Sequence, residues 1–302
     1  MRMQMSKKIS VSPVVAGHEM RIGQGFNAIH FAENDFQGMI DPVVMLDHFH
    51  MTVPTFEPHP HAGISAVTYV FEDSASPHHN YDSLGNQGPI HGGDLHWFVA
   101  GRGAVHTEQP EGENPHVHAL QIFVNLPAIQ KMIAPHAVHV DAADMPVFQA
   151  PGVRVRVVAG ESQGLHSPAQ LPQPFTLLDG FLEAGGTFEH TVPVGWNAMI
   201  YAVQGTLGVS MDAFACTQQL TAGQALGTSE ANTVRLAAAD PAHFVILSGP
   251  ALAEPMVKHG PLVMNTLEQM NERLRAYRRG EFGRLELPTS LAGHLSAAKD
   301  AT

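Results

Sequence analysis

Cysteine is almost absent from this chain of 302 residues. Cys216 is the only thiol, so no disulfide can form within the chain, and nothing indicates an oxidising compartment. Long hydrophobic runs are also missing, because no apolar stretch reaches the roughly 18 residues that a membrane-spanning helix needs. The chain is basic near its start, but no apolar segment follows, so we expect no secretory signal. We therefore expect a soluble, cytoplasmic protein with no membrane partner.

Charged side chains are scarce, and basic ones are the scarcer kind. Charged side chains of both signs together make up 15% of the chain, against about 25% in an average soluble protein. Hydrophobic residues make up 44%, which excludes a disordered acidic chain. The 16 Lys and Arg residues against 28 Asp and Glu residues give a net charge of −12. This balance argues against direct nucleic-acid binding, which needs a basic surface.

Short apolar runs between turn residues dominate the chain. The 28 glycines and 22 prolines indicate many turns and few long helices. Val153, Val155 and Val157 alternate with Arg154 and Arg156, which is the pattern of a half-buried strand. Further strands are predicted over 65–72, 95–100, 119–126, 175–181, 198–203, 206–210, 234–239 and 243–247.

These strands predict an all-β chain made of two antiparallel sandwiches or barrels of similar length. The length also suits two domains at about 150 residues each. Residues 159–174 are rich in Gly, Ser, Gln and Pro, and we expect a loop there, near the domain boundary. We place the two domains at residues 1–150 and 151–302.

One short helix is predicted near the C-terminus. Thr266 and Gln269 fit the capping box at a helix start, and Gly280 fits the end. The arginines near that end either complement the helix dipole on a solvated face or form an anion or partner site. We expect residues 290–302 to form a loose tail. The apolar residues at helical spacing are Leu267, Met270, Leu274 and Tyr277. The arginines of the C-terminal turns are Arg273, Arg275, Arg278 and Arg279.

Histidine is the abundant residue, with 20 copies, of which 15 lie in the first 150 positions. His59 and His61 lie in the run PHPHAG, and His106 and Glu108 lie in GRGAVHTE. Alternate side chains of an extended chain share a face, so each pair points one way. If the two strands are neighbours inside a barrel, three imidazoles and one carboxylate converge. The glycines beside both pairs permit tight turns and close backbone approach.

Such a set of ligands has a definite metal preference. It contains no thiolate, which argues against a structural zinc site. Imidazoles with one carboxylate suit Fe(II), and also Mn, Ni, Cu or Co. Four protein ligands leave two positions of an octahedral ion open, which implies catalysis or ligand sensing. The pairs His48/His50 and His116/His118 have the same spacing, however, and histidines on one strand face can simply be hydrogen-bonded.

The motifs of this chain resemble those of the pirin family, two-domain members of the cupin superfamily. The general cupin pattern places a glutamate three to four residues after the HxH pair. This chain has Ile64 and Ser65 there, and its carboxylate arrives at Glu108, as in pirins. The similar segments occur in the family's order from about residue 40 to 266: DP and MLDHF (41–49), PHPHAGISAVTYVFE (58–72), DSLGNQGPIHGGDLHWFVAGRGAVHTE (82–108), LQIFVNLP (120–127) and GPLVMNT (260–266).

The resemblance implies a bicupin of two jelly-roll-like barrels, with metal only in the N-terminal one. His59, His61, His106 and Glu108 are then the expected ligands. Fe(II) is the expected ion, with Mn, Ni, Cu, Co and Zn as alternatives. The C-terminal half has no HxH or HxE pair, which agrees with a metal-free second barrel. His48 and His118 either support the pocket or pack structurally.

Two functions follow from the resemblance. Some bacterial pirin-like proteins resemble quercetin 2,3-dioxygenase in activity, which implies O₂-dependent opening of a flavonol ring with loss of carbon monoxide. Glu108 would then take the proton of the flavonol 3-hydroxyl as general base. The nearby Phe49, Met51, Phe56 and Phe98 either line a pocket for this aromatic substrate or belong to the barrel core.

Other pirins resemble transcriptional cofactors or modulators of metabolic enzymes, in which the iron oxidation state changes a surface. This regulatory role needs a protein partner and no substrate cavity. A β scaffold with a vestigial site is the third alternative, and the complete ligand set argues against it.

Overall fold

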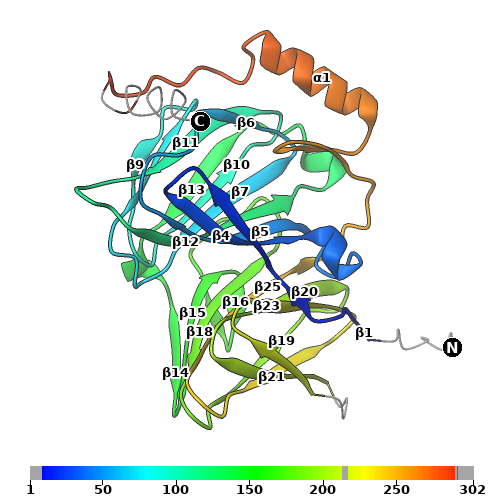
Figure 1. Ribbon diagram of the computed structural model, residues 1–302. Coiled ribbons are helices and arrows are strands. Elements are labelled where there is room, and N and C mark those ends of the chain that lie inside the picture. Colours follow the sequence, from blue (N-terminus) through cyan, green and yellow to red (C-terminus); the bar gives the residue numbers. More distant parts are fainter. Residues whose placement is uncertain (1–8, 213–216, 290, 292–302) are drawn as a thin grey trace, which may run out of the picture.

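The structure, a computed structural model, describes residues 9–212, 217–289 and 291. Two strand-rich units and one helix make up this part of the chain (Figure 1). Cys216 and nearly all of the expected tail beginning at residue 290 lie outside the described residues.

Two antiparallel sheets form the first unit. The small sheet carries both halves of the predicted metal site. The large sheet runs, in spatial order, β13 (His136–Val140), β10 (Leu95–Val99), β7 (Ile64–Val70), β12 (Val117–Asn125), β5 (Val43–Met51), β4 (Phe26–Ala32) and β3 (His18–Ile22). The small sheet runs β6 (His59–His61), β11 (Ala104–Pro110), β8 (His78–Asp82) and β9 (Gln87–Ile90). Short 3-10 helices lie at Glu33–Phe36, Ala128–Gln130 and Ala142–Asp144.

The second unit repeats this arrangement of a large and a small sheet. The large sheet runs β1 (Ser10–Val11), β23 (Gln224–Ser229), β20 (Trp196–Gln204), β25 (Ala242–Pro250), β18 (Thr176–Leu182), β15 (Val153–Ala159) and β14 (Val147–Ala150), and β2 (Val15–Ala16) also pairs with β23. The small sheet runs β19 (Thr187–Thr191), β24 (Thr233–Ala237), β21 (Thr206–Met211) and β22 (Gln218–Thr221). Two hairpins stand apart, β16 (Glu161–Ser162) with β17 (Leu165–His166) and β26 (Val257–His259) with β27 (Leu262–Met264).

The predicted all-β architecture of two units with one C-terminal helix is confirmed. Each strand predicted from alternating or continuous apolar residues overlaps an observed one, with bounds that differ by at most three residues. The stretch 159–174 is not wholly a loop, because it contains the hairpin of β16 and β17. None of the helices among the described residues is long and apolar enough to span a bilayer.

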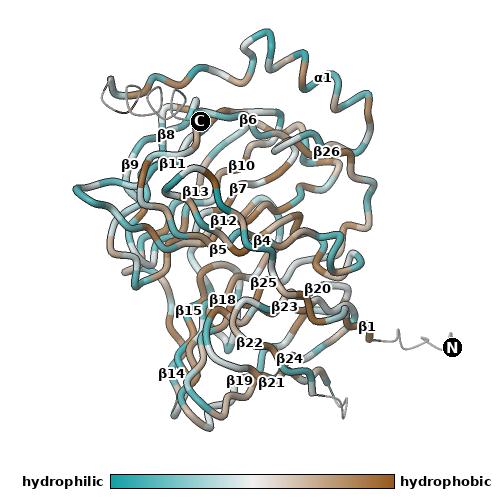
Figure 2. Tube along the Cα trace, viewed as in Figure 1, coloured by the Kyte–Doolittle hydropathy of each residue, from teal (hydrophilic) through white to brown (hydrophobic). Residues whose placement is uncertain are grey.

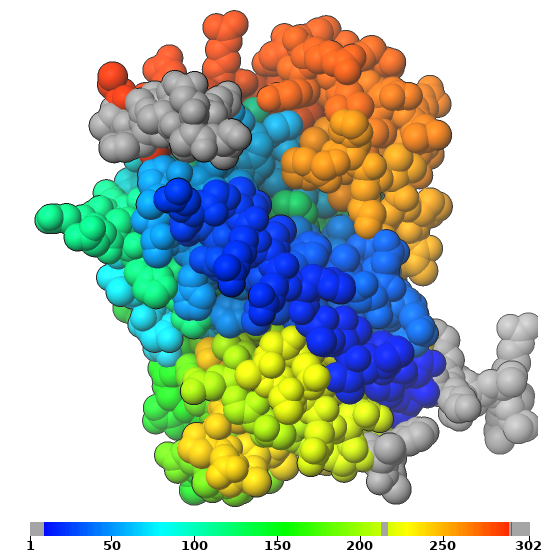
Figure 3. Space-filling view, viewed as in Figure 1, coloured from blue at the N-terminus to red at the C-terminus, as the bar shows by residue number. Residues whose placement is uncertain are grey.

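The two ends of the described chain cross between the units. β1 and β2 pair with β23 of the second unit. At the other end, Ala62 bridges to Leu262, and Met264 and Met270 pack with Ala62 and Val105 on the first unit. In Figures 1 and 3 the dark blue segment descends onto the lower unit, while the orange segment covers the upper one. The domain division at residue 150 stays a prediction.

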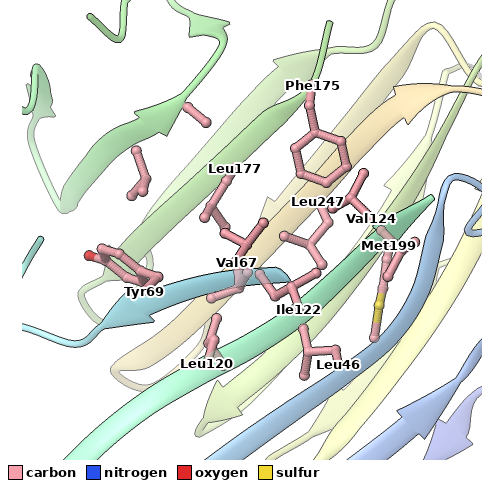
Figure 4. Packing of buried hydrophobic residues seen from close by; sticks show 14 of the residues in the cluster. Leu46, Val67, Tyr69, Leu120, Ile122, Val124, Phe175, Leu177, Met199 and Leu247 are labelled. Carbon is pink, nitrogen blue, oxygen red and sulfur yellow. The ribbon is translucent and has the colours of Figure 1, made fainter. Parts of the chain in front are cut away.

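The two large sheets pack against each other through a shared hydrophobic core. Leu46, Val67 and Ile122 of the first unit meet Leu177 and Leu247 of the second (Figure 4). Figure 2 shows hydrophobic stretches along the strands of both units. Because β7 has the barrel interior on one face and this core on the other, all of its residues are buried. Even its polar residues Ser65 and Thr68 are buried.

The expectation that β15 is half-buried is wrong. Val153, Val155 and Val157 face the core of the second unit, and the arginine face lies against the first unit. Arg154 donates two hydrogen bonds to the Glu72 carboxylate, at 2.6 and 2.8 Å, and Arg156 donates one at 2.6 Å. Alternation with charged residues therefore marks an ion-paired contact between units here.

The predicted helix is α1 (Leu267–Arg278). The Thr266 hydroxyl accepts a hydrogen bond from the Gln269 amide, as the capping box requires, and Gly280 adopts a positive φ of 78° beyond the end. Arg275 and Arg279 pair with Glu272 on the same helix. This supports the dipole and solvated-face interpretation of the arginine cluster. Leu267 is 70% exposed, so the buried face begins at Met270.

Candidate metal centre

The two predicted ligand pairs lie on neighbouring strands. β6 pairs with β11 in antiparallel register, which sets His59 opposite His106 and His61 opposite Ala104. Gly63 turns the chain directly after β6 with a φ of +73°. A Cβ atom there would lie 1.9 Å from the carbonyl oxygen of Val263, so only glycine allows this approach.

Three imidazoles converge as the sequence predicts. The ring centroids of His59, His61 and His106 lie 4.7 to 4.9 Å from one another. One nitrogen of each ring lies within 4.8 Å of the others. The Nε2 atoms of His61 and His106 are 2.9 Å apart. Three nitrogens at this spacing fit one divalent transition-metal ion.

The surroundings of the rings fix their orientation. His59 Nδ1 donates to the carbonyl oxygen of Glu57 at 2.8 Å, so its Nε2 is left as the ligand atom. The Phe98 ring stacks on His106 with an interplanar angle of 6°, and Phe123 contacts His61 edge-on. Packing of this kind holds a ligand in place before the ion binds.

Burial favours the neutral form of all three imidazoles. It lowers the pKa of His59, and it lowers the pKa of His61 and of His106 well below the ordinary value. The neighbouring imidazoles lower the pKa of His61 and of His106 further, because a second positive charge nearby is unfavourable. Neutral imidazole is the form that binds a metal.

Glu108 follows His106 on β11 and lines the same cavity. The Thr68 hydroxyl donates a hydrogen bond of 2.6 Å to its Oε2 atom, while Oε1 is buried without a hydrogen-bond partner. Burial raises the pKa of this carboxyl to about 7. Its oxygens lie outside the group of atoms within 4.8 Å of one another. The assignment of Glu108 as fourth ligand therefore stays a prediction.

A cavity of about 120 Å³ opens onto these side chains. The expected pocket residues Phe49, Met51 and Phe56 line it. Phe98 does not, because it lies behind His106 as a stacking partner. Further lining residues, which the sequence motifs did not identify, are Phe26, Met45, Asp47, His78, Gln121 and Phe123.

His78 is the most distinctive of the added residues. Both of its ring nitrogens are buried without a hydrogen-bond partner, and Nδ1 lies 3.9 Å from Oε2 of Glu108. The sequence signal is weak, because His78 does not belong to an HxH pair. Only the pairing of β8 with β11, which is a long-range feature, brings it to the site.

His48 and His118 do not line the cavity. They lie where the large sheet of the first unit meets the second unit, and His48 Nδ1 lies 2.6 Å from the hydroxyl of Tyr201. Within the described residues, the groups of three metal-binding side chains all belong to the first unit. A metal-free second barrel is still an expectation.

Comparison with known proteins identifies the family. The family model described as Pirin matches residues 23–124, and the Pirin C-terminal cupin domain matches residues 177–283. Pirin of Rattus norvegicus is 34% identical over 284 residues, which covers 93% of this chain and 95% of that protein. A putative pirin-like protein of Arabidopsis thaliana is 35% identical over 247 residues, covering 81% and 89%.

A solved structure also matches along most of the chain. Quercetin 2,3-dioxygenase from Acinetobacter baumannii superimposes with a TM-score of 0.80 at 27% identity, covering 92% of this chain and 99% of that one. One family match falls within the first sheet-pair unit, and the other covers most strands of the second, which supports two cupin domains. The chain therefore belongs to the pirin family of bicupin proteins.

Proposed function

We propose that this protein is a metal-dependent dioxygenase that acts with O₂ on flavonol-type aromatic substrates. The observation that carries the proposal is a triad of neutral imidazoles at the floor of a cavity walled by aromatic side chains. The similarity to a protein named quercetin 2,3-dioxygenase, over nearly its whole length, supports the same activity here.

His59, His61 and His106 would hold the metal, with Glu108 as the fourth ligand and Fe(II) as the expected ion. A bound ion of this type acts as a Lewis acid that lowers the pKa of a hydroxyl ligand and orders the reactants. The three imidazoles supply nitrogen donors without a thiolate, which fits Fe(II) and the neighbouring divalent ions.

The remaining chemistry comes from the protein. Glu108 would accept the proton of the flavonol 3-hydroxyl at Oε1, which is buried and without a partner. Thr68 holds Oε2 in place through its hydrogen bond. Phe49 and Phe56 line the cavity and would pack against a flat aromatic substrate.

The volume of the cavity favours a second candidate function. A dry cavity of about 150 Å³ holds a molecule the size of benzene, so about 120 Å³ admits roughly one ring. A flavonol would enter only if wall side chains such as the half-buried Phe56 moved outward. A regulatory pirin, which binds metal and a protein partner without turnover, needs no such opening.

One experiment separates the two candidates. Apo-protein is reconstituted anaerobically with Fe(II) and then exposed to O₂ with a panel of flavonols, and both carbon monoxide and flavonol absorbance are measured. We expect carbon monoxide release in step with flavonol loss. Bound metal without turnover across the panel would contradict the dioxygenase proposal and support the regulatory one.

Glu108→Gln tests the proposed base in the same assay. Removing a general base typically costs about 10²- to 10⁴-fold in rate, and we expect kcat to fall within that range. Metal content, measured alongside, shows whether the loss follows from the missing base or from a missing ligand. His136→Ala, an exposed strand histidine away from the site, serves as the matched control. Unchanged kcat in Glu108→Gln would contradict the role.

A further inference from the structure

A second group of histidines lies outside the metal centre. The motifs HFH (48–50) and HVH (116–118) fall on or beside the neighbouring strands β5 and β12. Their antiparallel register sets His118 opposite His50 and Leu120 opposite His48. His48, His50 and His118 therefore lie together on one face of the sheet, at the junction with the second unit.

These imidazoles are close enough to share an ion. One nitrogen of each of the three lies within 4.8 Å of the others. The Nε2 atoms of His48 and His118 are 2.7 Å apart, and the rings of His50 and His118 stack at 4.4 Å between centroids. His116 Nε2 lies 3.1 Å from His50 Nδ1 and extends the group toward solvent.

The nitrogens that face away from the cluster have supporting partners. His118 Nδ1 donates to the Asp73 carboxylate at 2.7 Å, and His48 Nδ1 meets the buried Tyr201 hydroxyl at 2.6 Å. Metal-ligating histidines almost always have such a partner on their second nitrogen, which sets the tautomer and orients the ring. Asp73 is largely exposed, with a side-chain exposure of 72%, so an ion can reach the group from solvent.

We propose that His48, His50 and His118 form a second divalent transition-metal site, at the junction between the two cupin domains. The donor set contains imidazole nitrogens and no thiolate, which suits Zn(II), Co(II), Ni(II) or Cu(II). Water or His116 completes the coordination.

Binding requires one change of tautomer at His48. In the metal-free state the two Nε2 atoms at 2.7 Å share a proton, one as donor and one as acceptor. In the loaded state both Nε2 lone pairs face the ion, and His48 carries its proton on Nδ1. The Tyr201 hydroxyl then accepts a hydrogen bond from that nitrogen. Because Tyr201 belongs to β20 of the second unit, the ion would link the two units through His48.

The test counts ions. Chelator-treated full-length protein is titrated with Co(II), dialysed and analysed for metal, and visible absorption records the ligand field of each bound ion. His59→Ala/His61→Ala removes the centre described above, and His50→Ala/His118→Ala removes the second site. His136→Ala is the matched control, because it is an exposed strand histidine outside both groups.

We expect two Co(II) ions per chain in the unaltered protein and in the control, one in each double variant, and none when the four substitutions are combined. We also expect Co(II) to raise the unfolding temperature of His59→Ala/His61→Ala, and not that of the quadruple variant. Circular dichroism checks that every variant is folded.

Two results would overturn the second site. One is a folded His59→Ala/His61→Ala variant that binds no Co(II), with one ion in the unaltered protein. The other is a His50→Ala/His118→Ala variant that still binds as many ions as the unaltered protein. A separate result would contradict metal binding by His59 and His61, namely a His59→Ala/His61→Ala variant that binds as much Co(II) as the unaltered protein.

Discussion

At the residue scale, the site depends on uncharged groups held in a dry interior. His61 is fully buried, and His106 and Glu108 are nearly so. Unpaired charge at such positions costs several kcal/mol, so the imidazoles stay neutral and the carboxyl retains its proton more readily. Burial disfavours the protonated imidazoles and thereby leaves their nitrogen lone pairs free to bind a metal.

Buried histidine also makes the stability of this protein depend on pH. Burial lowers the pKa of His190 to about 4, and the hydroxyl of Ser162 is its neighbour at 3.1 Å. The folded-state pKa lies below the unfolded value of about 6.5, so the unfolded chain takes up the proton first as the pH falls. Stability is therefore unaffected above about pH 6.5 and declines between pH 6.5 and 4.

His190→Gln isolates this contribution. From pH 7 to pH 5 the linkage relation gives about 2 kcal/mol for a single histidine with this shift. Urea denaturation at both pH values measures the fall in the free energy of unfolding from pH 7 to pH 5. We expect this fall to be about 2 kcal/mol smaller in His190→Gln than in the unaltered protein. An equal fall in both proteins would show that His190 is not held neutral.

At the element scale, the short strand β6 sets the geometry of the metal centre. Its pairing with β11 brings the two ligand pairs together, and Gly63 lets the following turn pass close to the Val263 carbonyl. The strand alternation and the flanking glycines predict this much from the sequence alone.

Gly63→Ala should disturb both the fold and the site. The substitution combines a strained φ of +73° with a Cβ contact of 1.9 Å to backbone, so we expect a loss of at least about 2 kcal/mol and weaker metal binding. Thermal unfolding and Co(II) titration measure the two effects.

Gly85→Ala is the matched control, since Gly85 has a φ of +90° with no atom within 4 Å of the added Cβ. It should show the backbone strain without the contact and should bind metal normally. Equal effects of the two substitutions would contradict a special role for the approach at Gly63.

Features that depend on long-range packing were harder to predict from the sequence. His78 reaches the cavity through the pairing of β8 with β11, and Phe98 stacks behind His106 and does not face the cavity. The charges of Arg154 and Arg156 predict a solvent-exposed strand face, yet both side chains bind Glu72 of the other unit. Local periodicity reports which side chains share a face, and it does not report what that face meets.

At the scale of the whole molecule, the two cupin domains share one hydrophobic core. Val67 and Ile122 of the first pack with Leu177, Met199 and Leu247 of the second (Figure 4). The chain ends cross between the units and add to this junction. A core shared in this way couples the stability of the metal-binding unit to that of its partner.

Leu247→Ala tests this coupling. Truncating a buried leucine typically costs about 2–5 kcal/mol, and Leu247 is 1% exposed. We expect a loss in that range within a single cooperative transition by calorimetry, with the metal-centre and second-domain signals shifting together. Val194→Ala, which is 83% exposed, should change stability by less than about 0.5 kcal/mol. Two separate transitions in Leu247→Ala would contradict a shared core.

Anomalous X-ray scattering at the iron edge, from crystals reconstituted with Fe(II), is the most direct test of the central claim. The account predicts a strong iron peak about 2 Å from one nitrogen of each of His59, His61 and His106. A crystal with iron bound elsewhere and no peak among these three imidazoles would contradict it.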